Sequence, residues 1–241
     1  MSITDTAIAR LRDMILAGEP PPGSRLPPEQ ELAAQLGISR GSMREAVRAL
    51  SYLGLVNVRR GDGTYVTGLE PSQMLEGVRF AAEAARDGTV LDVMEVRSLL
   101  EPGAASLAAM RISQPELTEL RMHLERMRSA IGDPVRLVEH DAAFHDCIAR
   151  ATSNEWLAAL LRGLAAPTIQ ARRIRAEVQN EVPAATIEQH EQILSAIEEG
   201  KPELARATAL IHVEQTYRGL RALLNASEGG ELGHWILAPP E

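Results

Sequence analysis

Four polar residues in the later part of the chain have the types and spacing of a metal site. His145 follows Asp141 by four residues, so both side chains lie on one face of a helix, and apolar residues border that face. His190 and His212 lie among apolar residues of two further helical segments. If the three segments pack together, one carboxylate and three imidazoles meet inside a bundle and suit Zn²⁺, Ni²⁺ or Mn²⁺. Taken singly, each histidine is more often a hydrogen-bonded core residue, and spacing alone does not bring distant helices together.

A second set of residues has the pattern of a nucleic-acid contact. Arg40, Arg44 and Arg48 recur at every fourth position and form a basic stripe away from the apolar face made by Met43, Ala46, Val47 and Leu50. Ser42 lies near the N-terminal end of the same segment, the end that meets base edges when a helix enters the major groove. Arginine can pair with guanine or with phosphate. The alternative is a solvated arginine face on an ordinary helical subdomain.

The residues around this stripe predict a helix-turn-helix. Apolar residues at helical spacing predict a first helix over residues 3–15 and a short second helix over 31–36. Gly37 ends the second helix, and Ser39 is a good N-cap for a third helix over 40–53. A short helix, a glycine turn and a longer helix together form the helix-turn-helix pattern.

A basic hairpin is predicted after the third helix. Residues 55–58 and 64–67 have the composition of two short strands, and Arg59, Arg60 and Gly61 lie in the tight turn between them. Such a wing can reach the minor groove or the phosphate backbone.

Composition limits the class of protein. The net charge of −8 belongs entirely to residues 71–241, with seventeen basic and twenty-five acidic residues, whereas residues 1–70 have eight of each. The N-terminal part can therefore contact DNA while the remainder repels phosphate. Apolar residues make up 45% and aromatic residues 3%, which favours a helical globular protein. Cys147 is the single cysteine, which excludes an internal disulfide and a cysteine-based zinc site.

We expect a cytoplasmic protein. The first fifteen residues lack the apolar centre of a signal peptide, and no window approaches the eighteen uncharged apolar residues typical of a membrane span.

The helical periodicity predicts a mainly α chain: a winged helix-turn-helix of three helices and a two-stranded wing, followed by an all-α antiparallel bundle. We expect the first domain to end at residue 70, a linker and connecting helix over 71–91, the bundle over 92–225, and an irregular tail over 226–241. Breaks near residues 86–88, 112–113, 132–133, 152–154, 167, 180–183 and 200–202 divide the bundle into six or seven helices. Two of these breaks have capping signatures, at Ser113 with Glu116 and at Asp133 with Pro134.

Both parts of the chain resemble one known family. Residues 1–70 are similar to the N-terminal domain of GntR-family regulators, through the segments PGSRLP (22–27), EQELA (29–33), LGISR (36–40), MREA (43–46) and GDGT (61–64). Residues 92–224 resemble the FCD effector domain of the FadR subfamily, through RSLLE (97–101), DAAFH (141–145), Ser153-Asn154, HEQILSAI (190–197) and His212. Many relatives have an arginine at the position of Gln30, so the DNA contact made there is weakened or replaced in this chain.

The resemblance implies roles for the residues found above. Arg40 and Arg44 would be the principal DNA contacts, Ser42 a phosphate contact, and Arg60-Gly61 the tip of the wing. In the metal-binding members of the subfamily, the ligands correspond to Asp141, His145, His190 and His212. For this set of three nitrogens and one oxygen we favour zinc over nickel and manganese.

The resemblance also implies an effector pocket beside the metal, usually for a small carboxylate. Arg97 is the candidate for the cation that neutralises the effector, although an ion pair with Glu101, four residues later, is an equal alternative. Arg172 and Asn154 are weaker candidates, and Asn154 could simply cap the helix that it begins. His123, His140, His234 and Cys147 fit no constellation.

Three functional hypotheses follow. The leading one is a homodimeric regulator that binds a palindromic double-stranded operator and, as a repressor, releases it when the effector binds. Activation by the effector is the less favoured direction. The alternatives are a metal-sensing repressor without an organic effector, and a metalloenzyme, although no separate catalytic base or nucleophile motif is present.

Overall fold

The computed structural model describes residues 3–75, 89–179 and 182–227. The chain divides into two compact units, Met1–Gly77 and Val78–Glu241, and each is described by itself. The division lies a few residues after the boundary expected from the sequence. The expected break at 86–88, residues 180–181 of another break, and residues 228–241 of the expected tail, with His234, lie outside the described residues.

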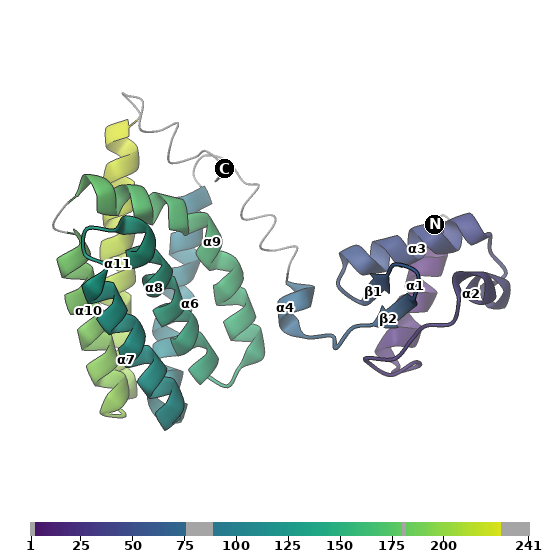
Figure 1. Ribbon diagram of the computed structural model, residues 1–241, viewed down its shortest axis with the longest axis horizontal. Coiled ribbons are helices and arrows are strands. Elements are labelled where there is room, and N and C mark those ends of the chain that lie inside the picture. The colour runs from purple at the N-terminus through teal and green to yellow at the C-terminus, as the bar shows by residue number, and fades with distance from the viewer. Residues whose placement is uncertain (1–2, 76–88, 180–181, 228–241) are drawn as a thin grey trace. The chain divides into compact units, whose positions relative to one another are not determined.

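The first unit has three main helices, a hairpin and, near its end, the short helix α4 (Pro71–Met74) (Figure 1). The main helices are α1 (Ile3–Leu16), α2 (Glu29–Leu36) and α3 (Arg40–Tyr52). The strands β1 (Val56–Arg59) and β2 (Gly63–Val66) pair antiparallel, with Val56 opposite Val66 and Arg59 opposite Gly63. The predicted winged helix-turn-helix is therefore confirmed, with each strand displaced by one residue from its expected bounds.

Local chemistry explains the turn between α2 and α3. Gly37 adopts a left-handed conformation with φ of 66°, which a residue with a Cβ atom rarely adopts. The Ser39 side chain then accepts a hydrogen bond from the Ser42 backbone nitrogen at 3.0 Å and caps α3. The apolar face of α3 is buried against α1, so its arginine stripe lies on the exposed side.

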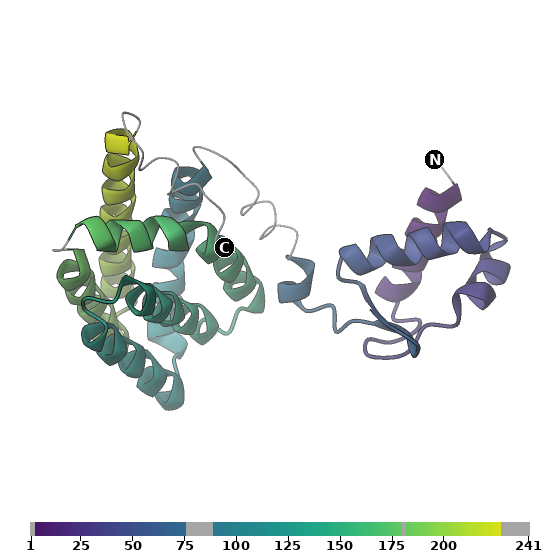
Figure 2. The same ribbon diagram turned by 45° about the horizontal axis from the view of Figure 1, so that its top comes forward.

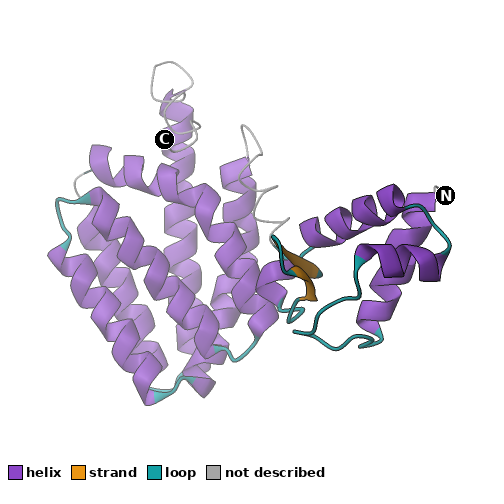
Figure 3. Ribbon diagram, turned by 45° about the vertical axis from the view of Figure 1, so that its right-hand side comes forward, coloured by secondary structure: helices purple, strands orange, loops and turns teal. Residues whose placement is uncertain are grey.

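The second unit consists of helices (Figure 3). Among the described residues its helices are α6 (Thr89–Arg111), α7 (Gln114–Ser129), α8 (Pro134–Ala151), α9 (Glu155–Val178), α10 (Val182–Glu198) and α11 (Pro202–Ser227). The most extensive packing joins α6 to α11, α7 to α8, α8 to α9, and α10 to α11. The capping box at Ser113 and the cap at Asp133 form as predicted. The mainly α fold is confirmed, and no helix among the described residues is long and apolar enough to cross a membrane.

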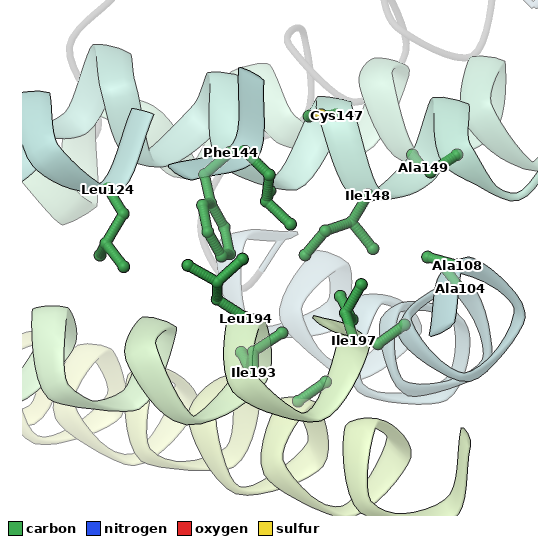
Figure 4. Packing of buried hydrophobic residues seen from close by; sticks show 14 of the residues in the cluster. Ala104, Ala108, Leu124, Phe144, Cys147, Ile148, Ala149, Ile193, Leu194 and Ile197 are labelled. Carbon is green, nitrogen blue, oxygen red and sulfur yellow. The ribbon is translucent and has the colours of Figure 1, made fainter. Parts of the chain in front are cut away.

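The centre of the bundle lies between α8 and α10 (Figure 4). Phe144 and Ile148 point from α8 toward Leu194 and Ile197 on α10, and all four side chains are buried. Close packing on this side positions the polar face of α8, which carries Asp141 and His145, relative to α10 and α11.

The predicted break at Pro167 was wrong, because α9 continues through it. A proline inside a helix removes one backbone hydrogen bond and presses on the preceding turn, so it bends a helix that packing holds together. Figures 1 and 2 show α9 bending partway along its length. Buried residues on both sides of the proline, including Leu164 and Ala171, stabilise the two halves.

Candidate functional site

Three helices of the bundle bring the predicted ligand residues to one point. Asp141 and His145 come from successive turns of α8, His190 from α10 and His212 from α11. One ligand atom from each residue lies within 4.8 Å of all the others, and Asp141, His190 and His212 are buried. The convergence that spacing alone could not demonstrate is therefore present in the fold.

The distances between these atoms fit one metal ion. The Nε2 atom of His145 lies 3.2 Å from the Nε2 atoms of both His190 and His212. The Oδ1 atom of Asp141 lies 3.3 Å from the Nε2 atom of His190 and 3.9 Å from the Nε2 atom of His145. Ligand atoms bound tetrahedrally at the usual zinc distances of about 2.0–2.1 Å are themselves about 3.3 Å apart.

The opposite ring nitrogens have oxygen neighbours that orient the imidazoles. The Nδ1 neighbours are the Thr186 carbonyl at 2.6 Å from His190, Gln189 Oε1 at 2.8 Å from His212, and Glu101 Oε2 at 3.3 Å from His145. A backbone carbonyl only accepts hydrogen bonds, so His190 carries its proton on Nδ1 and directs an Nε2 lone pair at the cluster. If His145 and His212 also carry their protons on Nδ1, three Nε2 lone pairs face one another. A cation between the three nitrogens then offsets the repulsion.

The electrostatics of the site favour the metal-ready forms of its groups. Burial alone would raise the pKa of Asp141, but the adjacent Arg172 guanidinium holds the pKa well below its ordinary value. Burial lowers the pKa of His145 far below its ordinary value, and the attraction of Asp141 offsets only part of this effect. Burial, followed by the proximity of His190 and His145, does the same to the pKa of His212. A carboxylate beside neutral imidazoles is the protonation state that a divalent metal requires.

Two buried arginines adjoin the cluster. Arg172, on the second half of α9, forms an ion pair with Asp141 Oδ2, while Asp141 Oδ1 faces the histidines. The Arg172 side chain is 9% exposed, and its Nη2 atom has no hydrogen-bond partner among the described residues. The Nε atom of Arg97 lies 2.5 Å from Glu101 Oε1, and its Nη1 atom donates a hydrogen bond to Thr168 Oγ1 at 2.8 Å. The ion pair considered as the alternative role of Arg97 is therefore present, and Arg97 is also part of the cavity walls.

Two cavities flank the cluster, and Arg97 and Arg172 line both. The smaller has a volume of about 30 Å³ and lies on the side of Asp141 and His212. The larger has a volume of about 320 Å³ and lies between α8 and α9, on the side of His145. A ligand in the larger cavity would therefore be beside the proposed metal and both arginines.

Asn154 lies elsewhere, at the start of α9, where its Oδ1 atom accepts a hydrogen bond from the Leu157 backbone nitrogen at 3.1 Å. It is not among the described residues that line either cavity. Sequence reasoning also missed Gln189 and Thr168, whose roles come from contacts between helices. Thr186 precedes His190 by one helical turn, a signal that could have identified its carbonyl as the partner.

The predicted DNA-contact residues lie on the surface of the first unit. Arg40, Arg44 and Arg48 are exposed along α3. Arg44 is 3.4 Å from Glu29 of α2, and Arg48 is 2.9 Å from Glu45, so both are held by weak exposed ion pairs.

The hairpin carries the remaining predicted contacts. The Arg59 guanidinium lies over the Tyr65 ring, 4.2 Å from its centroid. Arg60 is exposed at the turn, and Gly61 has a φ of +79°, a conformation that favours glycine. Arg25, which was not predicted to take part, donates a hydrogen bond to the Asp62 carbonyl and tethers the turn.

Comparison with known proteins agrees with both halves of this description. Residues 3–66 match the gntR family of bacterial regulatory proteins, and residues 92–215 match the FCD domain. The HTH-type transcriptional regulator LutR of Bacillus subtilis is 33% identical over 204 residues, which cover 83% of this chain and 93% of that protein. The Uxu operon transcriptional regulator of Escherichia coli is 36% identical over 156 residues, covering 64% and 60%. The solved structure of a Streptococcus agalactiae GntR protein superposes with a TM-score of 0.68 at 30% identity, covering 90% of this chain and 99% of that one.

Proposed function

The chain belongs to the GntR family of bacterial regulatory proteins with a C-terminal FCD domain, and from this premise we propose that it is a metal-dependent, carboxylate-responsive repressor. Its relatives are transcriptional regulators and not enzymes, so the chain is a DNA-binding regulator, and the metalloenzyme hypothesis is set aside.

One observation carries the metal proposal: three imidazole nitrogens and one carboxylate oxygen converge at ligand spacing, with an oxygen beside each opposite ring nitrogen. Asp141, His145, His190 and His212 would hold the ion. Zn²⁺ suits the N₃O set best, and Ni²⁺ and Mn²⁺ are the other candidates. When bound, the metal supplies coordination positions that accept a carboxylate oxygen.

The carboxylate proposal rests on the cavity walls. Arg172 has an unpaired nitrogen in a desolvated position, which a carboxylate oxygen would satisfy with a charge-assisted hydrogen bond. Arg97, held by Glu101 and Thr168, adds positive potential from α6. The effector relieves repression if it binds more tightly to an arrangement of the protein that does not fit the operator.

The exposed arginines of α3 and the hairpin support an operator contact through Arg40, Ser42, Arg44 and Arg48, with Arg59, Arg60 and Gly61 at the wing. A palindromic operator has two half-sites and therefore requires two copies of the winged helix-turn-helix.

A homodimer would supply them. Exposed apolar side chains lie on the neighbouring helices α6 and α11, at Val96, Leu99, Met110, Leu204, Leu210 and Ile211. Because the two helices pack together, we take these side chains as the surface that a second copy would cover.

Metal analysis of the full chain tests the proposal. Wild type purified without chelator should carry about one divalent metal per chain, measured by mass spectrometry, and His190→Ala should carry almost none. His140→Ala is the matched control, because it removes an imidazole of the same bundle outside the ligand set and should keep the metal.

Metal retained in His190→Ala, or metal absent from wild type after reconstitution with Zn²⁺, would contradict the site. Operator selected from a random DNA library and followed by fluorescence anisotropy separates the two regulatory mechanisms. Release on addition of zinc alone would favour a metal sensor, and release that also needs a carboxylate would favour the proposal.

A further inference from the structure

The larger cavity has one polar side and one apolar side. Its polar side is formed by His145 of the metal cluster and by the adjoining residues Arg97, Glu101 and Arg172. The opposing walls of α8 and α9 carry four alanines: Ala142, Ala143, Ala165 and Ala166. Leu161 and Ile169 complete the apolar lining. The remaining lining residues, Asp146 and Arg162, are partly exposed and form an ion pair with each other at 3.0 Å. Short side chains on two facing helices leave open a space that larger residues would close.

The space is larger than a very small acid needs. Its volume is about 320 Å³, whereas a benzene-sized molecule fills an apolar cavity of about 150 Å³. Cavities of this volume fall at the lower end of the range for whole organic ligands, about 300–1,000 Å³. A ligand that occupied only the arginine side would leave the alanine walls in contact with trapped water.

The charges indicate one carboxylate. Glu101 already neutralises Arg97, Asp141 neutralises Arg172, and Asp146 pairs with Arg162. Among the described residues, the arginines of the lining therefore provide one unpaired buried nitrogen, Nη2 of Arg172. Against the alanine side chains, hydroxyl groups of a sugar acid would lose water without gaining partners, whereas methylene groups gain by leaving water. The charged residues on this part of the lining, Asp146 and Arg162, are already paired with each other.

We propose that the effector is a monocarboxylate with an apolar chain of about six to ten carbons, a range set by the cavity volume. Its carboxylate binds at Arg172 and the metal, and its chain lies against the four alanines. This inference rests on the proposed function and specifies its ligand.

The first test uses the zinc-loaded full chain and isothermal titration with straight-chain carboxylates from acetate to octanoate. Affinity should increase about fourfold for each added methylene until the cavity is full. Hexanoate should bind at least tenfold more tightly than gluconate, which has the same number of carbons. Tightest binding by acetate, or by gluconate, would overturn the inference while leaving a carboxylate-responsive regulator intact. Absence of binding by every acid would overturn both.

The second test fills the cavity. Ala166→Leu and, independently, Ala143→Leu should weaken octanoate binding at least tenfold and change acetate binding less than threefold, with metal content unchanged. Ala222→Leu is the matched control, because Ala222 is exposed on α11 away from the cavity, and it should bind like wild type. If a variant with leucine in the cavity is folded and metal-loaded but keeps the wild-type preference for long acids, the carbon chain of the ligand lies elsewhere and the inference is overturned.

Discussion

At the scale of single residues, the site is defined by which atoms carry protons. His145 and His212 are held neutral by burial, and Asp141 is held ionised mainly by Arg172. These states suit a bound cation, but they have a cost in the metal-free protein, because a buried neutral histidine resists protonation that the unfolded chain accepts freely.

The metal-free protein should therefore lose stability as the pH falls below about 6.5, the ordinary histidine pKa. The folded pKa values of His145 and His212 lie below it, so the unfolded state binds more protons in this range. Each histidine contributes a loss of at most about 1.4 kcal/mol per pH unit. Asp141 affects stability only in more acidic solution. Because its folded pKa lies below the ordinary value of 3.8, its stabilising contribution is present above pH 3.8 and is lost only as the pH falls below that value.

Urea unfolding of the chelator-treated protein at about pH 7.5 and 5.5 measures this difference. The double variant His145→Asn and His212→Gln should reduce the dependence but not abolish it, because burial also lowers the pKa values of His123 and His140. Equal unfolding free energies at the two pH values in the wild type would contradict the assigned protonation states.

At the scale of elements, α3 is the part expected to distinguish one operator from another. Arg44→Ala should weaken operator binding by about 1–3 kcal/mol if the arginine pairs with a base, and should reduce the preference for operator over random DNA. Arg48→Ala, at the next turn of the same stripe, is the comparison, since a phosphate contact weakens both DNAs alike. Fluorescence anisotropy at several salt concentrations measures both effects, and an unchanged preference in Arg44→Ala would remove its assigned role.

Elements were predictable wherever their determinants are local. Ser39 and Ser113 cap their helices, and Gly37 turns the chain, because these interactions involve residues within four positions. Pro167 was misjudged because the sequence shows the lost hydrogen bond but not the packing that keeps α9 continuous.

The same distinction applies to the site. Asp141 and His145 form a visible pair on α8, so the ligand set could be anticipated with the help of a family resemblance. The Arg172 ion pair with Asp141 and the alanine-lined cavity could not, because both depend on how the bent α9 meets α8.

At the scale of the whole molecule, the exposed apolar face of α6 and α11 should hold two chains together. Leu99→Glu combined with Ile211→Glu should yield a monomer by light scattering, because burying charges in an apolar interface without partners is strongly unfavourable. Operator affinity should fall as well, because a monomer offers only one winged helix-turn-helix to the two half-sites. Met122→Glu on α7 is the control, an exposed apolar residue away from this face. A monomeric wild type, or a dimeric double variant, would contradict the assignment.

Arg172 has a consequence for what a promoter could sense. One end of its guanidinium is committed to a carboxylate that faces the metal ligands, while the other nitrogen is unpaired in a side chain that lines the cavity. On this arrangement, each ligand binds more tightly when the other is present, by the same factor. Under the proposed function, gene expression would then report the joint presence of the acid effector and the trace metal, and metal starvation would leave the promoter unresponsive to the effector.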